Sequence, residues 1–285
     1  MSKDLLENIK KLREMTGVGF KDCKSALDET NGNIEKSVEF LRKKGIAKAS
    51  KKMSRTATEG IALVKEKDNQ ISIIEINSET DFVAKNQNFL NFCKEISEIN
   101  FLAKGNLKNL ENYKMKDGQL VKDSLVNLIA KIGEKITIRR ASFFDNSNGT
   151  NFFYVHSAQE KNIGKIISVV KIEGINKNQD IGNKIAMHIA ASSPLAIDKD
   201  GINQEIVDKE LEIIKAEILN SGKPTDLADK ISKGKISKFL NDNSLLNQLW
   251  IMDPKKKVSD IIKEHKSEKD IKIVNFVRFK VGEGI

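Results

Sequence analysis

The side chains that most often carry chemistry are few and scattered along this chain of 285 residues. Cys23 and Cys93 lie far apart and have no CxxC partner, and His156, His188 and His265 show no metal-ligand spacing. Neither GxxxxGK[ST] nor GxGxxG occurs, so no nucleotide-binding loop is expected. With no nucleophile–base pair and no metal cluster, we expect no enzyme, no metal and no cofactor. Any action on a nucleotide would go through a partner protein.

An acidic and aromatic segment, SETDFV at residues 78–83, lies between a predicted strand and a predicted helix. In one interpretation Thr80 or Asp81 caps the helix and Phe82 packs under the turn. In the other, the acid and the ring form a tip at the end of a sheet, where loops commonly carry function. The physics of the sequence alone does not choose between them.

The composition is that of a globular protein, with 39% hydrophobic and 31% charged residues. No apolar run approaches the roughly 20 residues that span a bilayer. The first seven residues contain two acids and no long apolar stretch, so we expect no secretory signal and a cytoplasmic location. Residues 1–55 hold 14 Lys and Arg against 8 Asp and Glu, whereas the rest of the chain is nearly neutral. We interpret the basic stretch at 43–55 as a solvated linker.

The first 45 or so residues are predicted to form three short helices. Glycines around residue 18 permit the first turn, and Asn31 with Gly32 ends the second helix. Asn33 is expected to cap the third helix and Gly45 to end it, with a basic, polar linker at 46–59 that can contain some helix. Apolar stripes support each helix: Leu5, Ile9 and Leu12; Cys23, Ala26 and Leu27; Ile34, Val38 and Leu41.

Beyond the linker the pattern predicts strands and helices in an order that recurs. The first series is a hairpin at 60–66 and 70–77, helices at 88–104 and 120–132, and a strand at 135–144. The second is a hairpin at 152–158 and 164–173, helices at 181–191 and 258–266, and a strand at 271–281. The strand at 70–77 is apolar on both faces and is expected to be central in its sheet. We predict an α+β fold with a duplicated core of two three-stranded antiparallel sheets, each covered by helices.

The chain is accordingly divided into residues 1–55, 56–145 and 146–285. The third part carries an insertion at about 203–240, predicted as an antiparallel helical hairpin with a sharp turn at 221–224. Such a hairpin either packs on the body or contacts a partner or a second copy, which would give a homodimer. The sequence does not decide between monomer and dimer.

Three sets of motifs resemble the elongation factor Ts family. TDFVAKN at residues 80–86 resembles the family signature, and LREMTGVGFKDCKSAL at 12–27 resembles its N-terminal module, which has the ubiquitin-associated (UBA-like) three-helix fold. The third set lies at 187–194, 221–224 and 276–284. The resemblance covers essentially the whole chain, in order.

This resemblance implies a guanine nucleotide exchange factor that acts on elongation factor Tu, both GDP-bound and nucleotide-free. In the family, the residues matching Asp81 and Phe82 enter beside the partner's Mg²⁺ site, so that Mg²⁺ is displaced and GDP leaves faster. Thr80 and Val83 flank them in the same site.

The resemblance also implies further partner contacts. Arg13, Phe20 and Lys21 match docking positions of the N-terminal module, although the family often has Met where Lys21 stands. Phe20 is either presented to the partner or held in the core. His156 matches a histidine that contacts the partner from the second half, or it is an ordinary polar residue at a strand end.

Two rival interpretations use other features. A ribosome- or RNA-associated factor would account for the net charge of +9 and the basic stretch, but the body is nearly neutral and has few aromatics for stacking. An adaptor for ubiquitin-like partners would use the three-helix part but leaves residues 80–86 unexplained. We therefore expect elongation factor Tu as partner, with no direct nucleic-acid or membrane contact.

Overall fold

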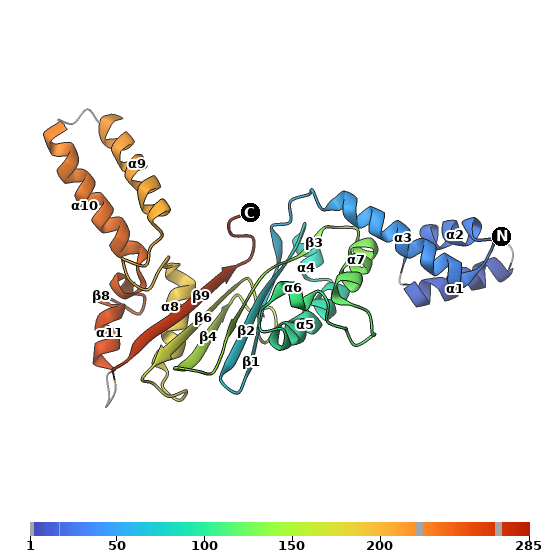
Figure 1. Ribbon diagram of the computed structural model, residues 1–285, viewed down its shortest axis with the longest axis horizontal. Helices are drawn as coiled ribbons and strands as arrows, with labels where there is room; N and C mark the ends of the chain where they lie inside the picture. The colour runs from blue at the N-terminus through green and yellow to red at the C-terminus, as the bar shows by residue number, and fades with distance from the viewer. Residues whose placement is uncertain (1–2, 17, 221–224, 266–269) are drawn as a thin grey trace.

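The computed structural model describes residues 3–16, 18–220, 225–265 and 270–285. These residues form a helical N-terminal part, a two-sheet body and a helical pair that projects from the body (Figure 1). Gly17, Lys266 and the turn at 221–224, all of which carried sequence predictions, lie outside the described residues. Across the part of the chain that is described, no helix is long and apolar enough to cross a membrane.

The N-terminal part is three helices: α1 (Lys3–Thr16), α2 (Phe20–Glu29) and α3 (Ile34–Lys52). They enclose a small core that contains the predicted residues Ile9, Leu12, Cys23, Ala26, Leu27 and Leu41. Asn33 caps α3 as predicted, because its side-chain oxygen accepts the N–H of Lys36 at 2.9 Å. The three predicted helices therefore form.

The predicted end of the third helix at Gly45 is wrong, because α3 continues to Lys52. At Gly45 the helix lies so close to α7 (Val121–Ile132) that an added Cβ would stand 3.3 Å from the Cβ of Ala130. Ala49, one turn further on, is buried in the core of the body. Packing against α7 thus favours helix beyond the glycine, and half of the expected linker, residues 46–52, is helical.

The first sheet has the order β3-β2-β1-β5 and is antiparallel throughout. Its strands are β1 (Glu59–Lys67), β2 (Gln70–Ser78), β3 (Ile136–Phe144) and β5 (Ile163–Gly164). β2 is central, as predicted, and Asp68 and Asn69 make the hairpin turn with φ of 51° and 60°. The prediction of three strands is wrong for this sheet, because β5 adds a fourth beside β1.

The second sheet has the order β4-β6-β9, with three antiparallel strands as predicted. These are β4 (Thr150–His156), β6 (Ile166–Glu173) and β9 (Lys272–Lys280). In both sheets the second strand of a hairpin is central and the last strand of the series lies on its other side. This common order is what the predicted duplication requires.

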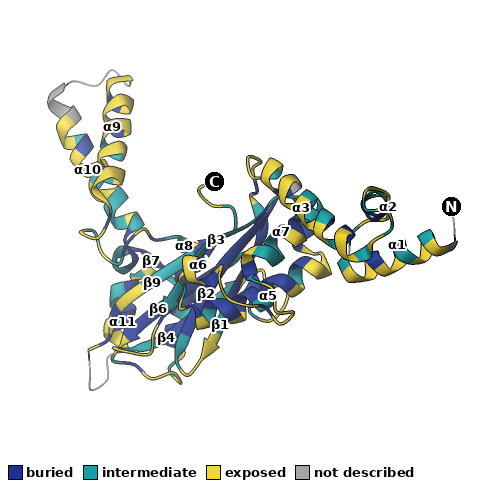
Figure 2. Ribbon diagram, turned by 45° about the vertical axis from the view of Figure 1, so that its right-hand side comes forward, coloured by how far each residue is buried: buried dark blue, intermediate teal, exposed yellow. Residues whose placement is uncertain are grey.

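The body consists of four layers: helices, sheet, sheet and helices. α5 (Gln87–Leu102) and α7 cover the outer face of the first sheet, and α8 (Ile181–Ser192) and α11 (Val258–Glu264) cover that of the second. Along β2, Ile71 and Ile73 face the second sheet and Ile74 and Ile76 face α5. The strand is apolar on both faces because it lies between two cores, and Figure 2 shows the burial concentrated in this body.

The inserted segment forms α9 (Gln204–Asn220) and α10 (Thr225–Asn243), which run side by side away from the body (Figure 1). α9 buries Ile214 and Ile218 but leaves Ile213 and Leu219 exposed. Contact with a second copy therefore stays a prediction, to be checked by mass measurement in solution. The remaining short elements were not predicted: α4 (Asp81–Ala84), α6 (Leu107–Leu110), a 3-10 turn (Leu245–Asn247), β7 (Leu249–Trp250) and β8 (Asp253–Lys257).

Candidate functional site

The segment between β2 and α5 folds into a single helical turn, α4, at the end of the central strand. Thr80 caps it with an extended backbone, and its hydroxyl accepts the N–H of Val83 at 3.5 Å. Asn86 then caps α5 by accepting the N–H of Asn88 at 2.9 Å. Two helix starts within seven residues leave the backbone of this segment, which we call the tip (residues 80–86), little freedom.

The apolar side chains of the tip lie in two environments, the core and the solvent. Val83 and Ala84 are buried in the core under α5, whereas Phe82 is 80% exposed. An aromatic ring in that position contributes little to the stability of the free chain. Of the two interpretations of the sequence, Thr80 does cap the turn, but Phe82 does not pack beneath it.

Asp81 is held as a carboxylate beside the ring. Its Oδ2 accepts a hydrogen bond from Lys85 Nζ at 2.8 Å, and this bond, with the charges of Lys85 and Lys165, lowers the pKa of Asp81 below its ordinary range. Lys165 in turn pairs with Glu59 at 2.7 Å. Exposed ion pairs contribute little to the free energy of folding. Asp81 can therefore leave Lys85 and bind groups on a partner at a small cost in free energy.

Two carboxylates fasten the base of the tip to the start of β3. Glu134 accepts the N–H of Thr80 at 3.0 Å and its hydroxyl at 2.8 Å, and Glu79 accepts the N–H of Lys135 at 2.6 Å. Partial burial acts to raise the pKa of Glu79, but the Lys135 hydrogen bond and Arg55 outweigh it and lower the pKa. Sequence reasoning missed Glu134, which is 54 positions away; its place just after a helix-ending glycine was the available signal.

The predicted contacts of the N-terminal part lie together near the α1–α2 turn. Arg13 and Lys21 are exposed, and Phe20, the first residue of α2, is 42% exposed and outside the small core. The alternative in which Phe20 is a core residue is therefore wrong. These residues are remote from the tip, since α1 and α2 occupy the far end of the molecule from β2 (Figure 1).

His156 lies exposed at the end of β4, with its Nδ1 3.5 Å from the hydroxyl of Tyr154. Its backbone pairs with Ile166, the neighbour of Lys165, whose charge reaches Asp81. His156 and the tip therefore belong to the same end of the body.

His188 has a structural role, in contrast to His156. It is fully buried, hydrogen-bonds Gln248 at 3.0 Å and stacks on Trp250 with ring centroids 5.2 Å apart. Burial lowers its pKa, which favours the neutral ring.

Two further kinds of group that could carry chemistry are metal-ligating side chains and cysteine thiols. Among them, no three His, Cys, Asp or Glu side chains are placed to hold a metal ion. Cys23 and Cys93 are both buried and free, and burial raises the pKa of the Cys93 thiol well above its ordinary value.

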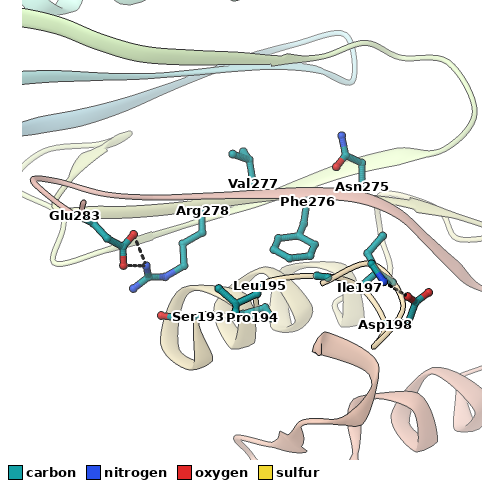
Figure 3. A pocket seen from close by; sticks show the side chains of 12 residues that line it. Ser193, Pro194, Leu195, Ile197, Asp198, Asn275, Phe276, Val277, Arg278 and Glu283 are labelled. Atoms are coloured by element: carbon teal, nitrogen blue, oxygen red, sulfur yellow. Dashed lines mark hydrogen bonds and ion pairs between the residues drawn. The ribbon is translucent and has the colours of Figure 1, made fainter. Parts of the chain in front are cut away.

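A hollow of about 640 Å³ lies between the loop after α8 and strand β9 (Figure 3). Leu195 and Phe276 line it, and Arg278 pairs with Glu283 at 2.8 Å along one side. The arginine also donates to the carbonyl of Ala190, so Arg278 and Glu283 already serve the fold.

The described residues form an α+β body that presents an anchored acid–aromatic turn. The family model described as Elongation factor TS matches residues 79–283. Elongation factor Ts of Rickettsia felis is 38% identical over 97% of this chain and 91% of its own length, and that of Methylobacterium nodulans is 41% identical over 97% and 92%. The chain belongs to the elongation factor Ts family.

Proposed function

We propose that the chain is a guanine nucleotide exchange factor for elongation factor Tu, acting in the cytoplasm during translation elongation. It would bind the GDP-bound partner, promote release of GDP and stay bound to the nucleotide-free form until GTP enters. Family membership supports the partner, and the exposure of Phe82 on a capped and anchored turn is the observation that carries the mechanism.

The partner in this proposal is a P-loop GTPase, which holds GDP with backbone amides, a lysine and Mg²⁺. The Phe82 ring enters an apolar gap beside the metal site and gains the burial that it lacks in the free chain. The Asp81 carboxylate disturbs the groups that order the water around Mg²⁺. Once Mg²⁺ leaves, the diphosphate charge is poorly neutralised and GDP dissociates faster.

Linkage then makes the cycle reversible. A factor that weakens GDP binding is itself bound more weakly when nucleotide is present, so entry of GTP releases it. No covalent bond forms or breaks in this scheme, so the chain is not an enzyme in the chemical sense.

The rest of the proposal concerns docking. Residues 1–55 would act as a UBA-like module that binds the partner through Arg13, Phe20 and Lys21, all of which are solvent-accessible. Residues 56–145 and 146–285 would form the two halves of the core, with His156 as a contact from the second. Because α3 runs without a break from the module to α7, it sets the spacing between module and tip.

Stopped-flow release of a fluorescent GDP from elongation factor Tu tests the proposal. We compare the unmutated chain with Asp81→Ala and Phe82→Ala, and use Leu102→Ala, another exposed apolar side chain, as the matched control. The unmutated chain and the control should accelerate release, and the two tip variants should accelerate it far less. No acceleration by the unmutated chain would reject the proposed function, whereas tip variants as active as the parent would reject only the role of the tip.

A further inference from the structure

The corner between α7 and β3 is a sharp turn built on Gly133. Gly133 has φ of 89° and ends α7 in the left-handed conformation, with its N–H bonded to the carbonyl of Ile129 at 2.9 Å. Glu134 and Lys135 follow, and β3 begins at Ile136. The turn brings residues 134 and 135 against the base of the tip.

The corner and the tip exchange hydrogen bonds reciprocally. The Glu134 carboxylate accepts the N–H and the hydroxyl of Thr80, while the Glu79 carboxylate accepts the N–H of Lys135. Each segment therefore supplies one side-chain acceptor and one backbone donor to the other. Hydrogen bonds in which one partner is charged are stronger than neutral ones, so these reciprocal bonds hold the two segments together more strongly than neutral loop contacts would.

The end of α3 is bound to the same corner. Lys52 Nζ donates to the carbonyl of Gly133, and Lys135 Nζ donates to the carbonyl of Arg55 at 2.7 Å. Arg55 also pairs with Glu79 at 3.3 Å. The corner is thus where the helix from the N-terminal part and the base of the tip meet, and α3 packs against α7 beside it (Figure 1).

The tip needs such an anchor because α4 is too short to stabilise itself. A helix of four residues cannot offset the cost of its own nucleation. Its closing bond, from the N–H of Ala84 to the carbonyl of Thr80, is long at 3.5 Å. Phe82 adds little packing in the free chain, since it is mostly exposed to solvent. Val83 and Ala84 hold one side of the turn in the core, and Thr80, which caps the turn, is the point at which the other side is held.

We infer that Glu134 is a positioning residue for exchange: through Thr80 it fixes the orientation in which Asp81 and Phe82 meet the partner. This inference rests on the proposed function and extends it to a residue outside the tip. Without the carboxylate, the Thr80 side of the tip is less constrained and must be ordered as Asp81 and Phe82 enter the nucleotide site, which costs entropy at the exchange step. Glu134 does not itself touch the partner's nucleotide site.

The test measures GDP release from elongation factor Tu over a range of factor concentrations, which separates the maximal rate from the concentration for half-maximal effect. For Glu134→Ala we expect the maximal rate to fall by about tenfold, the size expected for losing a charge-assisted hydrogen bond. The half-maximal concentration should change little, because the docking residues of the N-terminal part are intact. Glu134→Gln keeps one acceptor oxygen and should recover part of the rate. Glu264→Gln, which removes an exposed ion-paired carboxylate in the second half, is the matched control.

A double-mutant cycle with Phe82→Ala shows whether Glu134 acts through the tip. If it does, Glu134→Ala adds little to the loss already caused by Phe82→Ala. Fully additive losses, or a Glu134→Ala variant with a normal maximal rate, would overturn the inference while leaving the exchange function intact. Failure of the unmutated chain to accelerate release would instead reject the proposed function. Urea unfolding of each variant identifies any loss that comes from misfolding.

Discussion

Replacing Glu75 by Gln removes a buried negative charge at the point where both sheets meet the C-terminal residues. Glu75 lies on β2 and is fully buried. Its carboxylate binds Arg139 at 3.0 Å and Arg140 at 2.5 Å, both from β3, and accepts the side-chain amide of Asn77 at 3.0 Å and the N–H of Gly282 at 2.9 Å. Arg140 also donates to the carbonyl of Lys280 at the end of β9. The substitution therefore weakens the contact between the two halves of the body.

The expected loss follows from what remains after the charge is removed. Breaking a buried ion pair by removing one partner costs about 3–5 kcal/mol when the other charge stays buried. Here the side chains of Arg139 and Arg140 are 22% and 30% exposed, so water can partly solvate them. Gln also keeps one oxygen as an acceptor. We therefore expect Glu75→Gln to lower the free energy of unfolding by about 2–3 kcal/mol at neutral pH.

Urea unfolding at several pH values checks both the size and the cause of this loss. Burial alone would raise the pKa of Glu75, but hydrogen bonds from Gly282, Asn77 and Arg140 outweigh it and lower the pKa below 4.5. A carboxyl whose pKa is lower in the folded state stabilises the fold fully at pH values above its pKa in the unfolded state. This stabilisation is lost as the pH falls through its pKa in the folded state. The difference between parent and variant should therefore shrink on acidification below about pH 4. A difference under about 0.5 kcal/mol at neutral pH, or one that does not change with pH, would refute the reasoning.

Three other outcomes follow from burial and charge. Phe82→Ala should leave the free energy of unfolding within about 0.5 kcal/mol of the parent, whereas Phe89→Ala, in the core, should cost about 3–5 kcal/mol in the same urea assay. The hydrogen bond from Lys171 lowers the pKa of Asp145 from 3.8 to about 2. Between these two pH values, the free energy of unfolding should therefore fall less steeply with decreasing pH for Asp145→Asn than for the parent. Cys93 is fully buried with a raised pKa, so a thiol reagent should modify it only as fast as the protein unfolds.

The sequence predicts those elements whose apolar spacing is strong. β2 is an example, since a strand with apolar residues on both faces must lie between two cores. Gly45 is the opposite case. A glycine after a helical stripe is a frequent end signal, but here it permits the close approach of α7, and that contact depends on residues far away in sequence. β5 was not predicted as a separate strand, and Gly164 was placed at the start of the strand at 164–173. Two residues carry no periodicity, and only pairing with the edge of β1 makes them a strand.

The position of the tip could be predicted from the sequence, but its orientation could not. The acid and the ring at residues 81 and 82 fit a cap or an exposed tip equally well. What decides between these is that Val83 and Ala84 occupy the core, which turns Phe82 toward solvent. Glu134 belongs to the same set of contacts, but it lies 54 positions further along the chain, just before β3. Local spacing in the sequence therefore could not connect it to Thr80.

The two halves of the body share an order of strands but use the strand-to-helix junction differently. After β2 the chain forms α4, which is anchored at its base and leaves the Phe82 ring free. After β6 the chain turns at Gly174, with φ of 83°, so close to the backbone ahead of β9 that an added Cβ would collide with the carbonyl of Asp270. No acid–aromatic pair occurs between residues 174 and 179. The junction after β6 thus serves packing, because the segment that leads into β9, the last strand of the same sheet, lies against it. The junction after β2 is instead held from the side by the corner at Glu134, and its outer surface stays exposed.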